Sequence, residues 1–142
     1  MISIGCDHGG YELKEKVVAF LKEKNIEVKD CGCYSKDSVD YPIFGRAAAE
    51  AVASGECEKG IVICTTGIGI SMVANKVKGI RCALCADVFS AKMTRLHNDA
   101  NMLAMGAGMI GENLAYDIVE TFIGTEFSGE ERHQRRIDLI EE

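Results

Sequence analysis

The chain has 142 residues, a formal net charge of −6 and a hydrophobic content of 47%. This length suits a single domain, residues 1–142, with its own core, and the acidic balance argues against a broad nucleic-acid surface. The first residues lead directly into a strand pattern, and no apolar run approaches the roughly 20 residues of a membrane helix. We therefore expect a cytoplasmic protein with no signal peptide and no membrane segment.

Short apolar runs alternate with amphipathic segments along the whole chain. The predicted strands cover residues 2–6, 26–30, 61–63, 81–85 and 101–105, and the predicted helices cover residues 11–24, 43–53, about 70–77, 87–99, 111–123 and 130–141. This alternation is typical of a parallel sheet with helices on both faces. The predicted fold class is therefore α/β, a three-layer Rossmann-like sandwich around a five-stranded parallel sheet.

The segment Ile61–Ser71 combines a buried strand pattern with a glycine-rich turn and the start of a helix. Unpaired N–H groups at a helix N-terminus attract anions, and such a position favours the reactive thiolate of Cys64. The alternative reading is a buried structural cysteine. No lysine follows the turn as in a P-loop, and Met72 stands where a dinucleotide fingerprint needs glycine, so a nucleotide-binding module is disfavoured.

Other polar residues follow the predicted strands in the same way. Asp7 and His8 follow the first strand and Asp87 follows the fourth, and ligands of such sheets bind beyond the carboxyl ends of the strands. His97 and Asn98 lie elsewhere, at the C-terminal end of the helix that precedes the fifth strand.

Two arginines on the terminal helix form a candidate anion site. Arg132 and Arg136 are four residues apart, so they share a helix face and could bind one anion together. The alternative is a solvated helix whose arginines pair with Glu130, Glu131 or Asp138.

The seven cysteines give no sign of a disulfide framework or a metal site. An odd number in a chain without an export signal indicates free thiols. Cys82 and Cys85 resemble a redox pair, but residues three apart on a strand point to opposite faces. Cys31 and Cys33 have no second ligand pair at zinc-site spacing, so no structural metal is expected.

Six segments, taken in order, resemble the ribose-5-phosphate isomerase B family, which has galactose-6-phosphate and allose-6-phosphate isomerases as close relatives. They are Gly5–Gly10, Asp40–Pro42, Ile63–Gly69, Ala74–Val77, His97–Asn101 and Arg132–Arg136. The resemblance covers nearly the whole chain.

The resemblance implies an aldose–ketose isomerase that interconverts ribose 5-phosphate and ribulose 5-phosphate through a cis-enediolate, in the non-oxidative pentose phosphate pathway, without metal or cofactor. It implies that Cys64 moves the proton between C1 and C2, that His97 opens the furanose ring, and that Thr66 stabilises the enediolate with the backbone amides of residues 65–69. The implied substrate-binding residues are Asp7, His8, Tyr41, Thr65, Gly67, Ile68, Gly69, Ser71, Asn98, Arg132 and Arg136, with His8 and the arginines on the phosphate.

Three departures from the family pattern leave the substrate open. The family usually has glycine where Thr65 stands, arginine where Gly108 stands, and Gly-Gly where Glu130-Glu131 stands. A six-carbon substrate, allose or galactose 6-phosphate, is therefore an alternative, as is a non-catalytic sugar-phosphate sensor. The presence of both Cys64 and His97 favours a self-sufficient enzyme.

We also expect a homodimer, or a homotetramer, in which the terminal helix at about residues 130–141 contacts a partner subunit. A small α/β domain would otherwise leave its crevice open to water.

Overall fold

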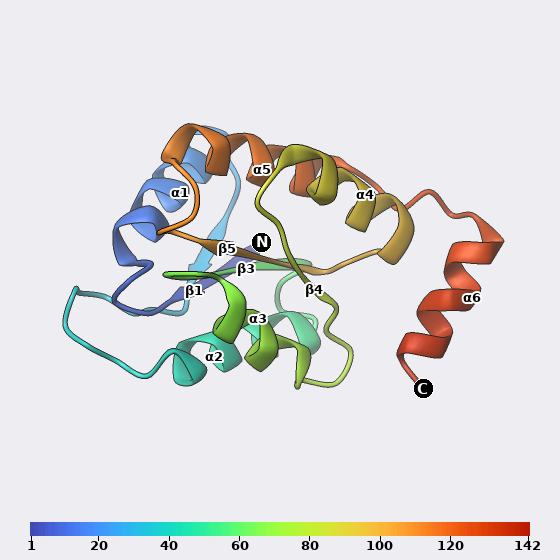
Figure 1. Cartoon of the computed structure of the whole chain (residues 1–142), viewed down its shortest axis with the longest axis horizontal. Coiled ribbons are helices and arrows are strands. Elements are labelled where there is room, and N and C mark those ends of the chain that lie inside the picture. Colours follow the sequence, from blue (N-terminus) through green and yellow to red (C-terminus); the bar gives the residue numbers. More distant parts are fainter.

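The computed structural model describes residues 1–142 as a central sheet flanked by helices (Figure 1). The strands are β1 (Ile2–Cys6), β2 (Val28–Asp30), β3 (Lys59–Cys64), β4 (Cys82–Leu84) and β5 (Met102–Gly106). The helices are α1 (Tyr11–Glu23), α2 (Tyr41–Ala53), α3 (Ile68–Asn75), α4 (Val88–Asn98), α5 (Glu112–Gly124) and α6 (Glu131–Ile140).

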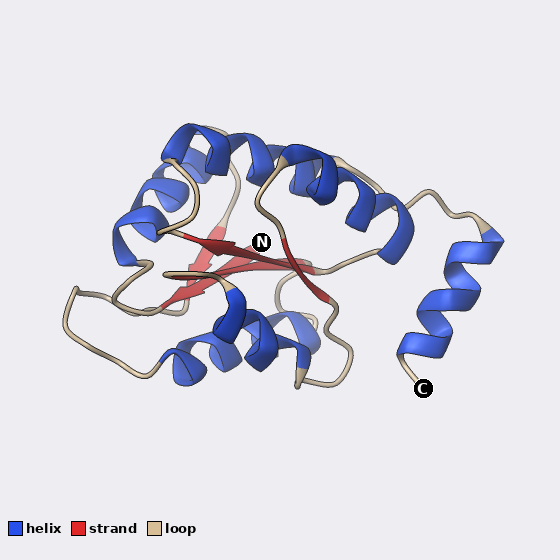
Figure 2. Ribbon diagram, in the orientation of Figure 1, coloured by secondary structure: helices blue, strands red, loops and turns tan.

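All strand pairs are parallel, and the strands lie in the order β2-β1-β3-β5-β4. Helices α1, α4 and α5 cover one face of the sheet, and α2 and α3 cover the other (Figure 2). This three-layer arrangement confirms the predicted fold class.

A hydrophobic cluster lies on each face of the sheet. Ile61 and Ile63 pack on the side of α1 and α5, whereas Val62 packs on the side of α2 and α3. All three side chains are fully buried. A strand covered on both faces needs apolar residues at every position, which explains the continuous apolar run in the sequence.

Several element boundaries differ from the predicted ones. Helix α2 begins at Tyr41 rather than Ile43, because Pro42 fits the first turn of a helix, where no N–H partner is required. Strand β2 begins at Val28 because the N–H of Ile26 donates to Leu21 of α1 and Asn25 adopts a left-handed conformation, so both residues complete the end of the helix.

Helix α6 lies apart from the sheet, beside the end of α4 (Figure 1). His133 and Ile137 are its buried residues. The other helices are at most 13 residues long, and no helix has the length and apolar character to cross a membrane. All seven cysteines are free thiols.

The connections that follow β3 and its two neighbouring strands lead to different faces of the sheet. The chain passes from β1 and β5 to helices on one face, whereas it passes from β3 to α3 on the other face. The loops therefore diverge on both sides of the carboxyl end of β3, and this divergence is where open α/β sheets form a ligand crevice. Cys64 is the last residue of β3 and stands at that point.

Candidate active site

The thiol of Cys64 is held by the turn that follows it. The backbone N–H of Gly67 donates a hydrogen bond to the Cys64 Sγ at 3.1 Å, and Cys64 is buried. Gly67 can aim its N–H back at the sulfur because it adopts φ 78°, a left-handed conformation that a glycine enters without strain. The turn therefore fixes the position of the sulfur at the end of β3.

Several backbone N–H groups near Cys64 have no acceptor in the chain. The Ile68 N–H donates to the Thr66 Oγ1 at 3.2 Å, so Gly67 and Ile68, two of the amides predicted to hold an enediolate, are already engaged. The unpaired N–H groups belong to Thr65, Thr66, Gly69 and Ile70. Unpaired donors at a helix N-terminus can stabilise a developing oxyanion. The hydroxyl proton of Thr66 also remains available.

The turn after β1 supplies a carboxylate and an imidazole to the same edge. Asp7 is buried, and its Oδ1 accepts the Gly10 N–H at 3.1 Å. His8 is exposed, and its Nδ1 accepts the Val39 N–H at 3.2 Å. Because Nδ1 is an acceptor, the proton of the neutral ring lies on Nε2, which remains available as a donor.

Tyr41 and Ser71 border the crevice on the side of α2 and α3. The Tyr41 ring packs against Gly69 so closely that a Cβ at Gly69 would lie 2.7 Å from the Tyr41 Cζ. Only glycine permits this approach of the ring. The Ser71 hydroxyl donates to the Ile68 carbonyl at 2.6 Å, which leaves its oxygen free to accept.

Thr65 lies between two glycines of neighbouring turns. A Cβ at Gly9 would overlap the Thr65 Oγ1, and a Cβ at Gly108 would lie 3.0 Å from the Thr65 Cγ2. The Gly108 N–H donates to the Thr65 carbonyl at 2.8 Å. Two of the departures from the family pattern, Thr65 and Gly108, are therefore in direct contact, and the threonine side chain fills the space beside the glycine.

His97 and Asn98 do not reach this edge of the sheet. They end α4, immediately before β5, whose first residue Met102 pairs with Gly60 near the start of β3. Gly60 and Cys64 are four residues apart on an extended strand, a span of about 13 Å. One chain therefore places Cys64 and His97 at opposite edges of its sheet, and the structure does not bring the two predicted catalytic residues together.

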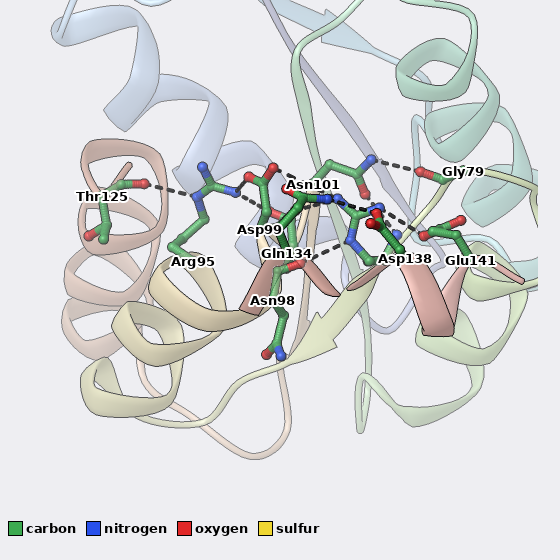
Figure 3. Close-up of polar contacts among 11 residues, drawn as sticks. Gly79, Arg95, Asn98, Asp99, Asn101, Thr125, Gln134, Asp138 and Glu141 are labelled. Carbon is green, nitrogen blue, oxygen red and sulfur yellow. Dashed lines mark hydrogen bonds and ion pairs between the residues drawn. The ribbon is translucent and has the colours of Figure 1, made fainter. Parts of the chain in front are cut away.

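A polar network fixes the end of α4 (Figure 3). The Arg81 guanidinium donates to the carbonyls of Asn98 at 2.9 Å and Asp99 at 2.8 Å, and pairs with Glu141 at 2.8 Å. Arg95 pairs with Asp99 at 2.8 Å. The Asn98 side chain points away from this network and accepts a hydrogen bond from Thr94.

Helix α6 brings its arginines to the same edge as His97. Arg132 and Arg136 are exposed, and Arg132 pairs with Glu130 at 3.0 Å, as the solvated alternative anticipated. Between them in sequence, His133 is buried, and its ring stacks on the His97 ring with 4.3 Å between centroids and 17° between planes. Sequence reasoning did not select His133, although the apolar Ile137 four residues later marks the same helix face as a buried one.

A family model described as Ribose/Galactose Isomerase matches residues 2–140 of the chain. The chain belongs to this ribose/galactose isomerase family. It is 46% identical over 139 residues to the ribose-5-phosphate isomerase B of Escherichia coli, covering 98% of this chain and 93% of that protein. It is 44% identical over 142 residues to the galactose-6-phosphate isomerase subunit LacB of Clostridium acetobutylicum, covering 100% and 82%. A solved structure of Clostridium thermocellum ribose-5-phosphate isomerase B has a TM-score of 0.97 at 54% identity, covering 99% of this chain and 94% of that one.

Membership of the ribose/galactose isomerase family confirms the recognised resemblance and makes the chain an aldose–ketose isomerase. A cavity of about 590 Å³ lies between α6 and the start of β4, at the opposite edge of the sheet from Cys64, and Asn98, Arg81 and Glu141 are among the residues that line it. Beside Cys64 the turn residues Thr65, Thr66 and Ile68 are exposed, so in a single chain this crevice is open to solvent.

Proposed function

We propose that this chain interconverts ribose 5-phosphate and ribulose 5-phosphate, in active sites that two copies of the chain build together. The observation that carries the proposal is the placement of Cys64, at a strand end surrounded by unpaired N–H donors. Family membership supports the reaction class, and the relatives named ribose-5-phosphate isomerase B support the five-carbon substrate.

In this proposal Cys64 performs the proton transfer. Its thiolate removes the C2 proton of the open-chain aldose, and negative charge develops on the C1 oxygen. The free N–H groups of the turn and the Thr66 hydroxyl stabilise that charge, because preorganised donors cost no reorganisation when the charge forms. The Cys64 thiol then returns the proton to C1, while the proton of the C2 hydroxyl passes to the C1 oxygen, and this leaves the C2 carbonyl of the ketose.

Substrate positioning falls to the surrounding polar groups. His8 would donate from Nε2 to the phosphate, and Asp7, Tyr41 and Ser71 would face the sugar hydroxyls. Arg132 and Arg136 of the partner subunit would complete the phosphate site, since guanidinium groups match phosphate geometry. Phosphate binding remote from C1 holds the sugar in place and can raise the rate of the chemical step.

Ring opening needs a separate acid and base, which we assign to His97 of the partner, with Asn98 beside it. His97 takes the proton of the C1 hydroxyl as the bond between C1 and the ring oxygen breaks, and it gives a proton to that oxygen. The His97 side chain is exposed, so a sugar can reach its ring nitrogens, and an imidazole can both take up and give a proton.

An apolar surface next to the Cys64 turn supports assembly of two copies. Ile68 and Met72 of α3, Leu84 of β4 and Val88 and Phe89 at the start of α4 are exposed. Phe89 is 71% exposed and Met72 is 61% exposed, and contact of such large apolar side chains with water is unfavourable. Helix α4 runs about 16 Å from this surface to His97. A two-fold partner with its α4 antiparallel would therefore place its own His97 near this Cys64.

The substrate is tested by measuring turnover of purified protein with ribose 5-phosphate, allose 6-phosphate and galactose 6-phosphate in parallel. We expect the highest kcat/KM with ribose 5-phosphate. The six-carbon alternative is favoured by Gly108, which leaves no side chain where the family pattern has arginine, and by the similarity to LacB. A higher kcat/KM for either six-carbon substrate would replace the proposed substrate, and no turnover of any would favour a sensor.

A second prediction separates ring opening from enolisation. His97→Asn should lower turnover of cyclic ribose 5-phosphate by about 10²-fold, the usual contribution of one acid–base group. It should largely spare exchange of the C1–C2 proton with solvent when the substrate is presented in open-chain form. Equal losses in the two assays would move His97 from ring opening to enolisation.

A further inference from the structure

The buried face of α6 contains an imidazole where an aliphatic side chain would be enough for packing. His133 and Ile137, one turn apart, are the residues that α6 buries against the rest of the chain. His133 is 6% exposed, and its Nε2 lies 3.4 Å from the Glu130 Oε2 on the preceding turn. Its ring faces the His97 ring at 4.3 Å and nearly in parallel. The buried ring therefore covers one face of the exposed one.

We propose that His133 is a positioning residue, whose buried ring is the platform that fixes the orientation of the His97 imidazole. The inference rests on the proposed function, in which His97 opens the sugar ring. His97 ends α4, where the chain leaves the helix through the left-handed Asp99, so its own backbone restrains it on one side only. Without a platform the exposed ring would sample several rotamers, and each productive proton transfer would be rarer.

The charges around the pair favour a neutral ring at His133. Burial lowers the pKa of His133, and the nearby positive groups His97, Arg132 and Arg136 lower it further, against the opposite effect of Glu130. His133 therefore stays neutral where an ordinary histidine would begin to take up a proton. A neutral ring can stack on a protonated His97, whereas two imidazolium rings at this separation would repel each other.

The test compares three variants of α6 by kinetics. His133→Ala should lower kcat for cyclic ribose 5-phosphate on the order of 10²-fold, as expected when a catalytic group loses its alignment. KM should change little, because Arg132 and Arg136 remain. His133→Phe keeps a flat ring and should recover most of kcat. Ile137→Ala, the matched control, weakens the docking of α6 without touching His97 and should leave kcat close to that of the wild type.

An NMR measurement tests, independently of activity, whether the His133 ring is the platform for His97. In NMR spectra of the full chain, the His97 ring protons, assigned by their absence in His97→Asn, should lose the ring-current shift from His133 in His133→Ala. An unchanged His97 signal would overturn the proposal, as would equal losses of kcat in His133→Ala and Ile137→Ala. A wild-type protein inactive on every sugar phosphate would overturn the proposed function instead, and the NMR shift would still test the stack.

Discussion

Cys64→Ala should abolish isomerisation, with kcat lowered about 10³-fold or more, because no other group at the end of β3 can take up the carbon-bound proton. The fold should survive the change. Loss of one buried sulfur, together with the hydrogen bond that it accepts from the buried Gly67 N–H, costs on the order of 1–2 kcal/mol of unfolding free energy. Activity is measured with ribose 5-phosphate, and stability by urea unfolding.

Cys57→Ala is the matched control. Cys57 is as well buried as Cys64, and burial raises the pKa of its thiol, so it stays protonated at neutral pH. It lies just before β3, at the opposite end of the strand from Cys64. The two variants should lose similar stability, and only Cys64→Ala should lose activity. Near-normal turnover in Cys64→Ala would remove Cys64 from the role of base.

The sequence predicts the sheet well because its signals are local. The run Ile61–Ile63 is apolar at every position, which a strand buried on both faces requires. Asp87 accepts the Ser90 N–H at 2.6 Å and caps α4, and aspartate is a common residue at that position. The order of the strands in the sheet, in contrast, depends on contacts between segments that are distant in sequence. That β5 lies between β3 and β4 follows from packing of the helices between them, and no residue of the sequence marks it.

Burial of charged groups also escapes sequence reasoning. The sequence pattern predicts an amphipathic helix around Lys14, and a lysine on such a helix is expected in solvent. The Lys14 side chain is nevertheless fully buried. Its ammonium group lies 2.8 Å from Asp30 and donates to the Cys33 carbonyl at 2.7 Å. The partners are distant in sequence, and only the folded chain brings them to the lysine.

The candidate site also has one part that the sequence predicts and one part that it does not. The polar residues that follow β1 and β3 could be predicted to meet, since parallel strands end at one edge. The sequence also places His97 elsewhere, at the end of the helix before β5, but it does not show that His133 stacks on the His97 ring, because the two residues are distant in sequence. The family resemblance names both residues as parts of one site. The single chain separates them, and this conflict is what a shared site resolves.

The strongest test of the shared site is complementation between two inactive variants. In the proposed site, Arg132→Ala would remove a phosphate contact, and Cys64→Ala would remove the base. If Arg132 serves the crevice of the partner, each homodimer is defective in both of its sites. We expect each variant alone to be nearly inactive with ribose 5-phosphate.

Mixing the two variants, unfolding them together and refolding them should restore activity. A heterodimer has one site that combines the intact Cys64 of one chain with the intact Arg132 of the other, while its second site lacks both. Random assembly makes half of the dimers heterodimers, so the mixture should recover about a quarter of wild-type activity. Gln134→Ala, an exposed change on the same helix, replaces Arg132→Ala in a control mixture and should be active before mixing.

The proposed sharing of the site has a physical reason in the enediolate intermediate. An enediolate that is open to bulk water can be protonated by the solvent instead of by the catalytic thiol, and the open crevice around Cys64 offers little protection in one chain. A partner that supplies His97, Arg132 and Arg136 would cover the crevice and add the positive charge that Gly108 does not provide. If subunit exchange is demonstrated by mass and the mixture stays inactive, then Arg132 acts on its own chain or does not contact substrate, and the shared site is wrong.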